Sequence, residues 1–102
     1  MAATLQVIYT IGDDTHFDDD YYGNTHMSLV AEHMGAHLQS ASASKGLAGG
    51  PDTPPSIYAI ATITFADMDT LNTAMAAAGP VVADIPNFTN TQPTMLIGET
   101  LT

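Results

Sequence analysis

The spacing of apolar residues along this 102-residue chain changes between two periods, and the order of these periods constrains the fold. Residues 4–11 alternate between apolar and polar side chains, which predicts a half-buried strand. Residues 56–66 are apolar on both alternating faces, which predicts a central strand that is covered on both sides. Two further strands are predicted over residues 37–48, where Gly46 would mark a bulge, and over residues 94–101.

The first predicted helix follows the first strand. Asp18 is a candidate N-cap for a helix that reaches about Met34, where Gly35 would end it. Because Gly23 and Asn24 are poor helix formers, we expect the first two turns of this helix to be irregular.

The second predicted helix begins at Asp67 or Asp69 and ends at Gly79-Pro80. Residues 81–85 are predicted to add one more turn, which Pro86 would break. The apolar residues of the second helix recur at helical spacing, at Met68, Leu71, Met75 and Ala78.

The resulting order is strand, helix, strand, strand, helix, strand, which predicts one ferredoxin-like α+β domain over residues 1–102. In this fold an antiparallel four-stranded sheet has both helices on one face. The other face would leave apolar residues exposed, either the set that contains Leu5 or the set that contains Ile8. Stacking on the sheet of a second copy would cover that face, so we expect a homodimer through the sheet faces.

The charge balance limits the choice of partners. The chain has 11 acidic residues and one cation, Lys45, which gives a formal net charge of −10. Nucleic acid and anionic membrane surfaces are therefore not expected as partners, because both need clusters of Lys or Arg. No Arg is present to hold a phosphorylated substrate, so uncharged or weakly polar ligands fit better. Solubility, or adaptation to a salty environment, is an alternative reason for the acidic composition.

Cysteine usage and apolar segments limit the chemistry and the location. The chain has no cysteine, which excludes disulfides, thiolate metal sites and cysteine nucleophiles. No apolar segment is long enough to span a membrane, and the N-terminus lacks the pattern of a signal peptide. We therefore expect a cytoplasmic protein.

Four residues of the first predicted helix are candidates for a functional site. At about 100° per residue they fall within an arc of roughly 60° that is expected to face the sheet. His26 is the leading candidate for a general acid or base, and a histidine that only ties the helix to the sheet is the alternative. His33 is a weaker candidate, because a histidine near a helix C-terminus can simply pair with the helix dipole. The four residues are Tyr22, which would orient the His26 ring, His26, Leu29 and His33.

Other side chains are candidates for ligand binding. Tyr9, Leu29, Tyr58 and Phe65 are expected to line an apolar ligand site, and Tyr9 and Tyr58 could instead lie in the dimer interface. Glu99 could pair with a histidine there. The spacing of His33 and His37 resembles a pair of metal ligands only if the helix continues through Gly35. The acidic residues within 13–20 fit helix capping and solvation. No metal and no cofactor are expected.

The first helix also carries a motif that resembles the EthD family. The motif consists of Phe17-Asp18-Asp19-Asp20-Tyr21-Tyr22 followed by His26-Met27-Ser28-Leu29, and the resemblance extends through residues 57–67, 84–88 and the last strand. Ser28 stands where the family usually has Pro, which implies a straighter turn here. The resemblance implies the dimeric α/β-barrel fold and an association with degradation of ethyl tert-butyl ether alongside a cytochrome P450 system.

Two functions follow as hypotheses. In the first, the protein acts on a small uncharged hydrophobic organic molecule in a catabolic or secondary-metabolic pathway, with His26 transferring a proton. In the second, it is a non-catalytic accessory dimer that binds such a molecule. Fold alone does not choose between them.

Overall fold

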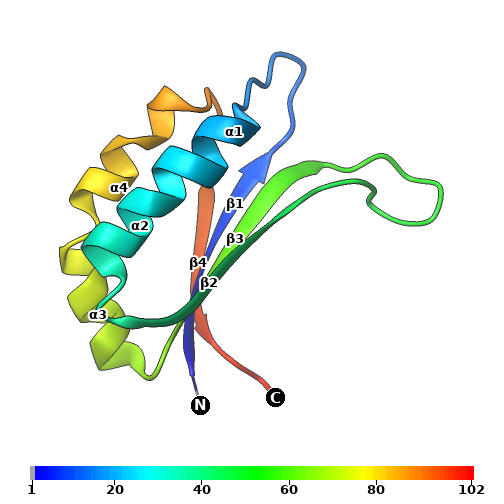
Figure 1. Ribbon diagram of the computed structural model, residues 1–102. Coiled ribbons are helices and arrows are strands. Elements are labelled where there is room, and N and C mark those ends of the chain that lie inside the picture. Colours follow the sequence, from blue (N-terminus) through cyan, green and yellow to red (C-terminus); the bar gives the residue numbers. More distant parts are fainter. Residues whose placement is uncertain (1) are drawn as a thin grey trace.

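The computed structural model describes residues 2–102 and contains one antiparallel sheet with its strands in the order β2-β3-β1-β4 (Figure 1). β3 and β1 are the two central strands, and β2 and β4 form the edges. This order confirms the predicted ferredoxin-like fold. The strands are β1 (Ala3–Thr10), β2 (Leu38–Lys45), β3 (Ile57–Phe65) and β4 (Thr94–Glu99).

All the helices lie on one face of the sheet, while the other face carries no helix (Figure 1). None of the helices in the described part of the chain is long and apolar enough to cross a membrane. The segment between β2 and β3 projects away from the body of the molecule as an extended arm (Figure 1). The helical elements are α1 (Asp19–Tyr21), a π-helical turn (Tyr22–His26), α2 (Met27–Met34), α3 (Met68–Ala76), α4 (Gly79–Ala83) and a 3-10 turn (Ile85–Asn87).

Side-chain caps define where the helices begin. The Asp18 carboxylate accepts a hydrogen bond from the Tyr21 amide, and the Asp67 carboxylate accepts one from the Thr70 amide. Both carboxylates therefore satisfy amides that have no partner within their helix. The caps confirm Asp18 and identify Asp67, rather than Asp69, as the start of the second helix.

Two predicted details of the chain path are wrong. Gly79 and Pro80 begin α4, whereas α3 already ends at Ala76, because proline is favoured in the first turn of a helix. The irregularity of β2 lies between Leu38 and Ser40 and not at Gly46. The Gly46 amide instead donates to the Tyr58 carbonyl at 2.7 Å, which continues the contact with β3 past the end of β2.

The π-helical turn changes which residues of the first helix face the sheet. Such a turn accommodates one residue more than an α-helical turn. After it, each inward-facing position therefore falls one residue later in the sequence than in a regular α-helix. The wheel of a regular helix predicts Leu29 and His33 on the inner face, but Val30 and Met34 are buried in their place. The buried stripe is therefore Tyr22, His26, Val30 and Met34.

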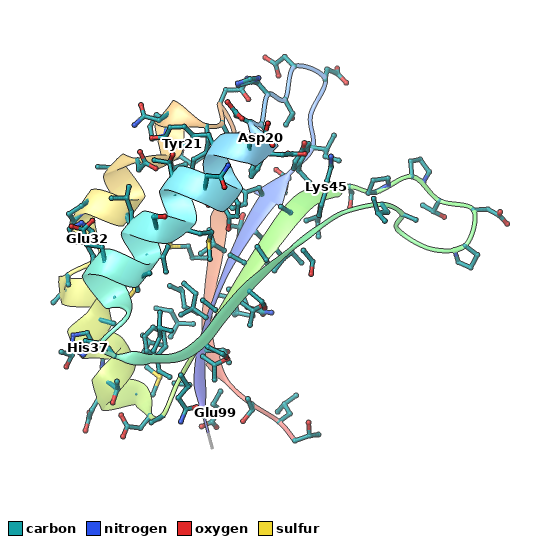
Figure 2. The ribbon with its side chains drawn as sticks, in the orientation of Figure 1. Asp20, Tyr21, Glu32, His37, Lys45 and Glu99 are labelled. Atoms are coloured by element: carbon teal, nitrogen blue, oxygen red, sulfur yellow. The ribbon has the colours of Figure 1, made fainter. Side chains whose placement is uncertain are left out.

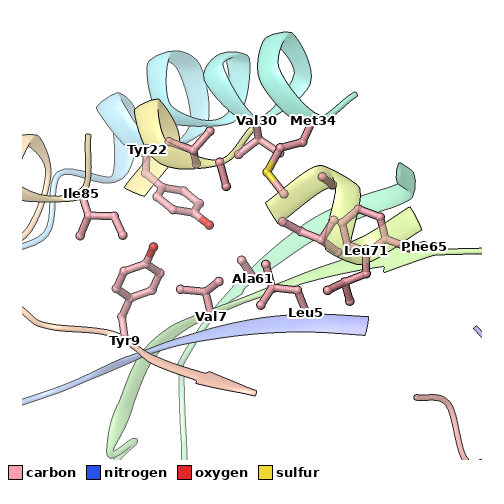
Figure 3. Packing of buried hydrophobic residues seen from close by; sticks show 14 of the residues in the cluster. Leu5, Val7, Tyr9, Tyr22, Val30, Met34, Ala61, Phe65, Leu71 and Ile85 are labelled. Atoms are coloured by element: carbon pink, nitrogen blue, oxygen red, sulfur yellow. The ribbon is translucent and has the colours of Figure 1, made fainter. Parts of the chain in front are cut away.

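The two faces of the sheet differ in composition. The helix-facing side chains of β1 and β3 are buried and form the core together with Phe88 and Leu71 (Figure 3). The opposite face carries Ile8, Ile60 and Leu96 among threonine and serine side chains, so it is less apolar than the core face. Within a single chain the helices cover one face of β3, so the predicted cover of its other face depends on a second copy of the protein.

The stability of the protein is expected to depend strongly on Leu71, a residue of α3 that is completely buried in the core. Leu71→Ala is expected to lower the free energy of unfolding by about 2–5 kcal/mol, because it leaves a cavity. The matched control is Leu47→Ala in the exposed arm, where the leucine is 84% exposed and the loss should be negligible. Chemical denaturation measures both, and equal losses would contradict this description of the core.

Candidate functional site

A small chamber of about 40 Å³ lies between the helices and the sheet. Its walls come from β1, β3, β4 and the inner sides of the helices, and most of the lining side chains are aliphatic or methionine. The polar groups that reach it belong to His26, Tyr9 and Tyr22. An apolar enclosure with a few convergent polar groups is typical of a ligand site.

His26, which lines this chamber, forms a buried pair with a carboxylate. Nδ1 of His26 lies 3.0 Å from Oδ2 of Asp84, and the two residues are only 4% and 7% exposed. The π-helical turn ends at His26, and Asp84 follows α4 directly, so two distant parts of the chain meet here. A histidine paired with a buried carboxylate is a common arrangement for proton transfer.

Asp84 is held in place by two further donors. The Tyr21 hydroxyl donates to Oδ1 of Asp84 at 2.6 Å, and the Asn87 amide donates to the same oxygen at 2.9 Å. Burial by itself would raise the pKa of Asp84, but the hydrogen bonds from Tyr21, Asn87 and His26 outweigh it and hold the pKa below its usual range. The bond to Asp84 also raises the pKa of the Tyr21 hydroxyl. Asp84 is therefore an ionised carboxylate at neutral pH.

This carboxylate selects the tautomer of His26. An ionised carboxylate only accepts hydrogen bonds, so Nδ1 must carry the proton that points at Asp84. Neutral His26 then has an unprotonated Nε2. No described group hydrogen-bonds to Nε2, and no fully buried side-chain nitrogen or oxygen in residues 2–102 lacks a partner, so Nε2 contacts accessible space. His26 lines the chamber, and Nε2 is the ring nitrogen that Asp84 leaves without a hydrogen bond.

Two tyrosines complete the polar part of the chamber. Tyr22 points from the helix toward the sheet, and Tyr9 points from the sheet toward the helices (Figure 3). Burial raises the pKa of Tyr22 to about 12, and burial together with the neighbouring Tyr22 raises the pKa of Tyr9 further. Both hydroxyls are therefore neutral hydrogen-bond donors at physiological pH.

Aromatic packing fixes the orientation of the imidazole ring. Tyr22 stacks on the imidazole of His26 with ring centroids 5.2 Å apart. The Phe88 ring also packs against this imidazole, with ring centroids 4.6 Å apart. The segment that carries Asp84 and Phe88 is tied to the start of the first helix, since the Asp18 amide donates to the Phe88 carbonyl at 2.8 Å. The histidine and its carboxylate are thus held by a rigid surrounding.

The structure brings together only some of the predicted site residues. His26, Tyr22 and Tyr9 line the chamber, whereas Leu29 and His33 do not, because the π-helical turn rotates them away. Phe65 is completely buried in the core but does not line the chamber.

Tyr58 lies in a separate open cleft of about 210 Å³ beside β2, where its ring stacks on Phe17 at 4.5 Å. The Tyr58 hydroxyl donates to Asp19 at 2.7 Å, and Lys45 forms an ion pair with the same carboxylate at 2.8 Å. The cleft and the chamber share only Tyr22. Lys45, the only lysine or arginine of the sequence, is therefore paired with Asp19 at this cleft and does not line the chamber (Figure 2).

Glu99, considered as a partner for a histidine, lies at the end of the sheet away from Tyr21, Asp20 and the start of the first helix (Figure 2). No cluster of three or more potential metal ligands occurs in residues 2–102. The partner of His26 is Asp84, which sequence reasoning missed. The sequence offers two signals for it: it is an isolated acidic residue within the apolar stretch 81–85, and it begins the segment 84–88 that resembles the EthD family. Neither signal pairs it with His26, which lies 58 positions away.

The lowered pKa of Asp84 predicts a pH dependence of stability. Because the folded pKa lies below the unfolded value of about 3.9, the contribution is complete above that value and is lost as the pH falls through the folded pKa. Asp84→Asn should cost about 1–3 kcal/mol at neutral pH. It should also reduce the loss of stability on acidification below about pH 4.

Denaturation at a series of pH values measures both effects. Asp52→Asn, in the exposed arm, is the control and should follow the wild type. A variant at Asp84 that retains the full acid-induced loss would show that the carboxylate is not ionised in the folded protein.

Comparison with known proteins agrees with this fold. A structure of an EthD-like protein from Ralstonia eutropha JMP134 is 27% identical, with a TM-score of 0.88, and the match covers 99% of this chain and 93% of that chain. An ethyl tert-butyl ether d (EthD) family protein from Bacillus halodurans C-125 shares the fold at 22% identity, with a TM-score of 0.80 and coverage of 99% and 100%.

A cofactor-independent oxygenase from Streptomyces nogalater, SnoaB, also shares the fold, at 13% identity, with a TM-score of 0.60 and coverage of 98% and 96%. No curated protein matches this chain in sequence. The EthD domain matches residues 13–92, which include the π-helical turn, His26, Asp84 and Asn87. The chain therefore belongs to the EthD domain family.

Proposed function

We propose that this protein binds a small uncharged organic molecule with one end in the chamber and removes a proton from it with Nε2 of His26. The observation that carries the proposal is the buried His26–Asp84 pair at the wall of an apolar chamber. A substrate proton would move to Nε2, and Asp84 would stabilise the imidazolium that forms. The electron pair left on the substrate would be stabilised by the neutral hydroxyls of Tyr9 and Tyr22.

The charge distribution supports an uncharged substrate. The net charge of −10 and the ionised Asp84 both oppose the approach of an anion. Proton transfer makes the substrate negative and His26 positive in the same step, so the net charge of the substrate and His26 together does not change.

Family membership supports a role in the metabolism of small oxygen-containing compounds. The B. halodurans relative is described as an ethyl tert-butyl ether d (EthD) family protein, and a catabolic pathway of that type is part of our proposal. SnoaB is a cofactor-independent oxygenase, so this fold can house chemistry without a bound cofactor, although fold alone does not transfer an activity.

A second function is binding without chemistry. The two neutral tyrosine hydroxyls favour it, because they can hold a polar group of a ligand without reacting. The two functions differ in one step, which is whether the bound molecule loses its proton.

The test uses 4-nitrophenol, whose anion is yellow and whose acid form is nearly colourless. At a pH below the pKa of the free phenol, the wild type is expected to convert the bound phenol into its anion, because Nε2 accepts the proton. His26→Gln should bind the phenol but produce no yellow anion. Asp84→Asn should lower the anion-to-acid ratio of the bound phenol by roughly 10- to 100-fold, since a charge-assisted hydrogen bond contributes about 1.5–3 kcal/mol.

His33→Gln is the matched control, because His33 lies on the same helix but outside the chamber. It should behave as the wild type. Binding with no yellow anion in the wild type would favour the binding function, and an anion that persists in His26→Gln would rule out His26 as the base.

We also propose that the protein is a homodimer joined through the helix-free sheet face. Ile8 and Ile60 lie opposite one another on the central strands, and Leu96 on β4 extends this apolar centre. A second copy would remove these side chains from water and cover the outer side of β3.

Ile60→Asp is expected to convert the dimer into single chains, because two carboxylates would be buried near each other at the interface. Ile97→Asp is the matched control, since Ile97 lies on the helix side of β4 and is exposed. Analytical ultracentrifugation should give twice the mass of one chain for the wild type and the control. A wild type that sediments as a single chain at micromolar concentration would refute the dimer.

A further inference from the structure

The chamber is too small to hold more than one end of an organic molecule. Its volume is about 40 Å³, whereas ligand sites in proteins usually enclose about 300–1,000 Å³. The rest of any substrate must therefore lie outside the chamber, in a neighbouring hollow of the surface.

A groove of about 410 Å³ adjoins the chamber at the β4 edge of the sheet. We call it the β4 groove; residues 89–93 line it together with Val82, Ile85, Pro86 and Met95. Val82, Ile85 and Met95 also line the chamber. These three side chains are thus the partition between the two spaces.

Two of the three side chains of the partition are partly exposed, while Ile85 is buried. Met95 and Val82 are 42% and 44% exposed, so neither is locked by surrounding atoms. Methionine has three rotatable bonds and adapts its shape at little cost. Ile97, the next helix-facing residue of β4, is also exposed, so this part of the sheet edge is not tightly covered by the helices.

The charges select what the β4 groove can hold. Its lining side chains are apolar or carry hydroxyl and amide groups, and none of them is charged. Lys45 lies on β2, at the opposite edge of the sheet, and is paired with Asp19. The ionised Asp84 directly precedes Ile85 of the partition. An anion would find no compensating charge here, while an uncharged molecule would meet no penalty.

We propose that the β4 groove holds the body of the substrate, whose weakly acidic end passes between Met95 and Val82 to reach Nε2 of His26. The inference rests on the proposed function, and it defines the substrate class as a phenol or an enolisable carbonyl compound with an apolar body. Its acidic O–H or C–H lies at one end of the molecule. That bond breaks, the proton joins Nε2, and the electron pair stays on the substrate as a phenolate or enolate.

The alternative access route is the open cleft of Phe17, Lys45 and Tyr58, because Tyr22 lines both that cleft and the chamber. Two sets of variants separate the routes. Met95→Phe on β4 and Val82→Phe on α4 each place a larger side chain between the β4 groove and the chamber. Ala43→Phe places a larger side chain in the alternative cleft. All three positions are exposed, so the fold should tolerate each change, which circular dichroism can verify.

The measurement is the affinity of each variant for 4-nitrophenol by titration calorimetry, and formation of the yellow anion is recorded separately. Met95→Phe and Val82→Phe are expected to weaken binding by about tenfold or more, because overpacking costs about 1–3 kcal/mol. Ala43→Phe is expected to bind as the wild type does. The inference is wrong if Ala43→Phe alone weakens binding, or if none of the three variants does.

The two proposals fail in different ways. If the wild type binds the phenol without forming its anion, proton removal by His26 fails, whereas the dependence of binding on Met95 and Val82 can still hold. If the anion forms in Met95→Phe and Val82→Phe at wild-type affinity, the β4 groove is refuted and His26 remains the base.

Discussion

The hydrogen bond between His26 and Asp84 is the interaction on which the candidate site depends. A carboxylate in a low-dielectric interior is stable only when donors compensate for the water it has lost, and here Tyr21, Asn87 and His26 supply them. In return the carboxylate fixes the tautomer of the imidazole. A single buried charge thereby joins the first helix to the segment after α4 and leaves one ring nitrogen free to act.

The π-helical turn determines which side chains reach that charge. By adding a residue to the turn, it places Tyr22 and His26 over the chamber and turns Leu29 and His33 away from it. Turns of this kind cost stability and are frequent at functional sites. The sheet supplies the opposite wall through Tyr9, so the polar groups of the chamber converge from both layers.

The sequence predicts the fold well because its signals are local. Alternation along residues 4–11 and 56–66, the Asp18 cap and the stop at Gly35 each depend on neighbours in the chain. The site is harder to predict. Helical spacing predicts Tyr22 and His26, but it does not decide between the ligand site and the dimer interface for Tyr9. The extra residue in the π-helical turn breaks the wheel beyond His26. Asp84 pairs with His26 across 58 residues, and no spacing rule connects them.

The most direct test is nitrogen-15 NMR of the His26 side chain, recorded over a series of pH values that reaches the neutral form of the ring. We expect the proton of the neutral ring to reside on Nδ1, directed at Asp84, and Nε2 to be unprotonated. In Asp84→Asn this preference should weaken, because the neutral amide can also donate to the ring. A proton found on Nε2 in the wild type, with Nδ1 bare, would contradict the account.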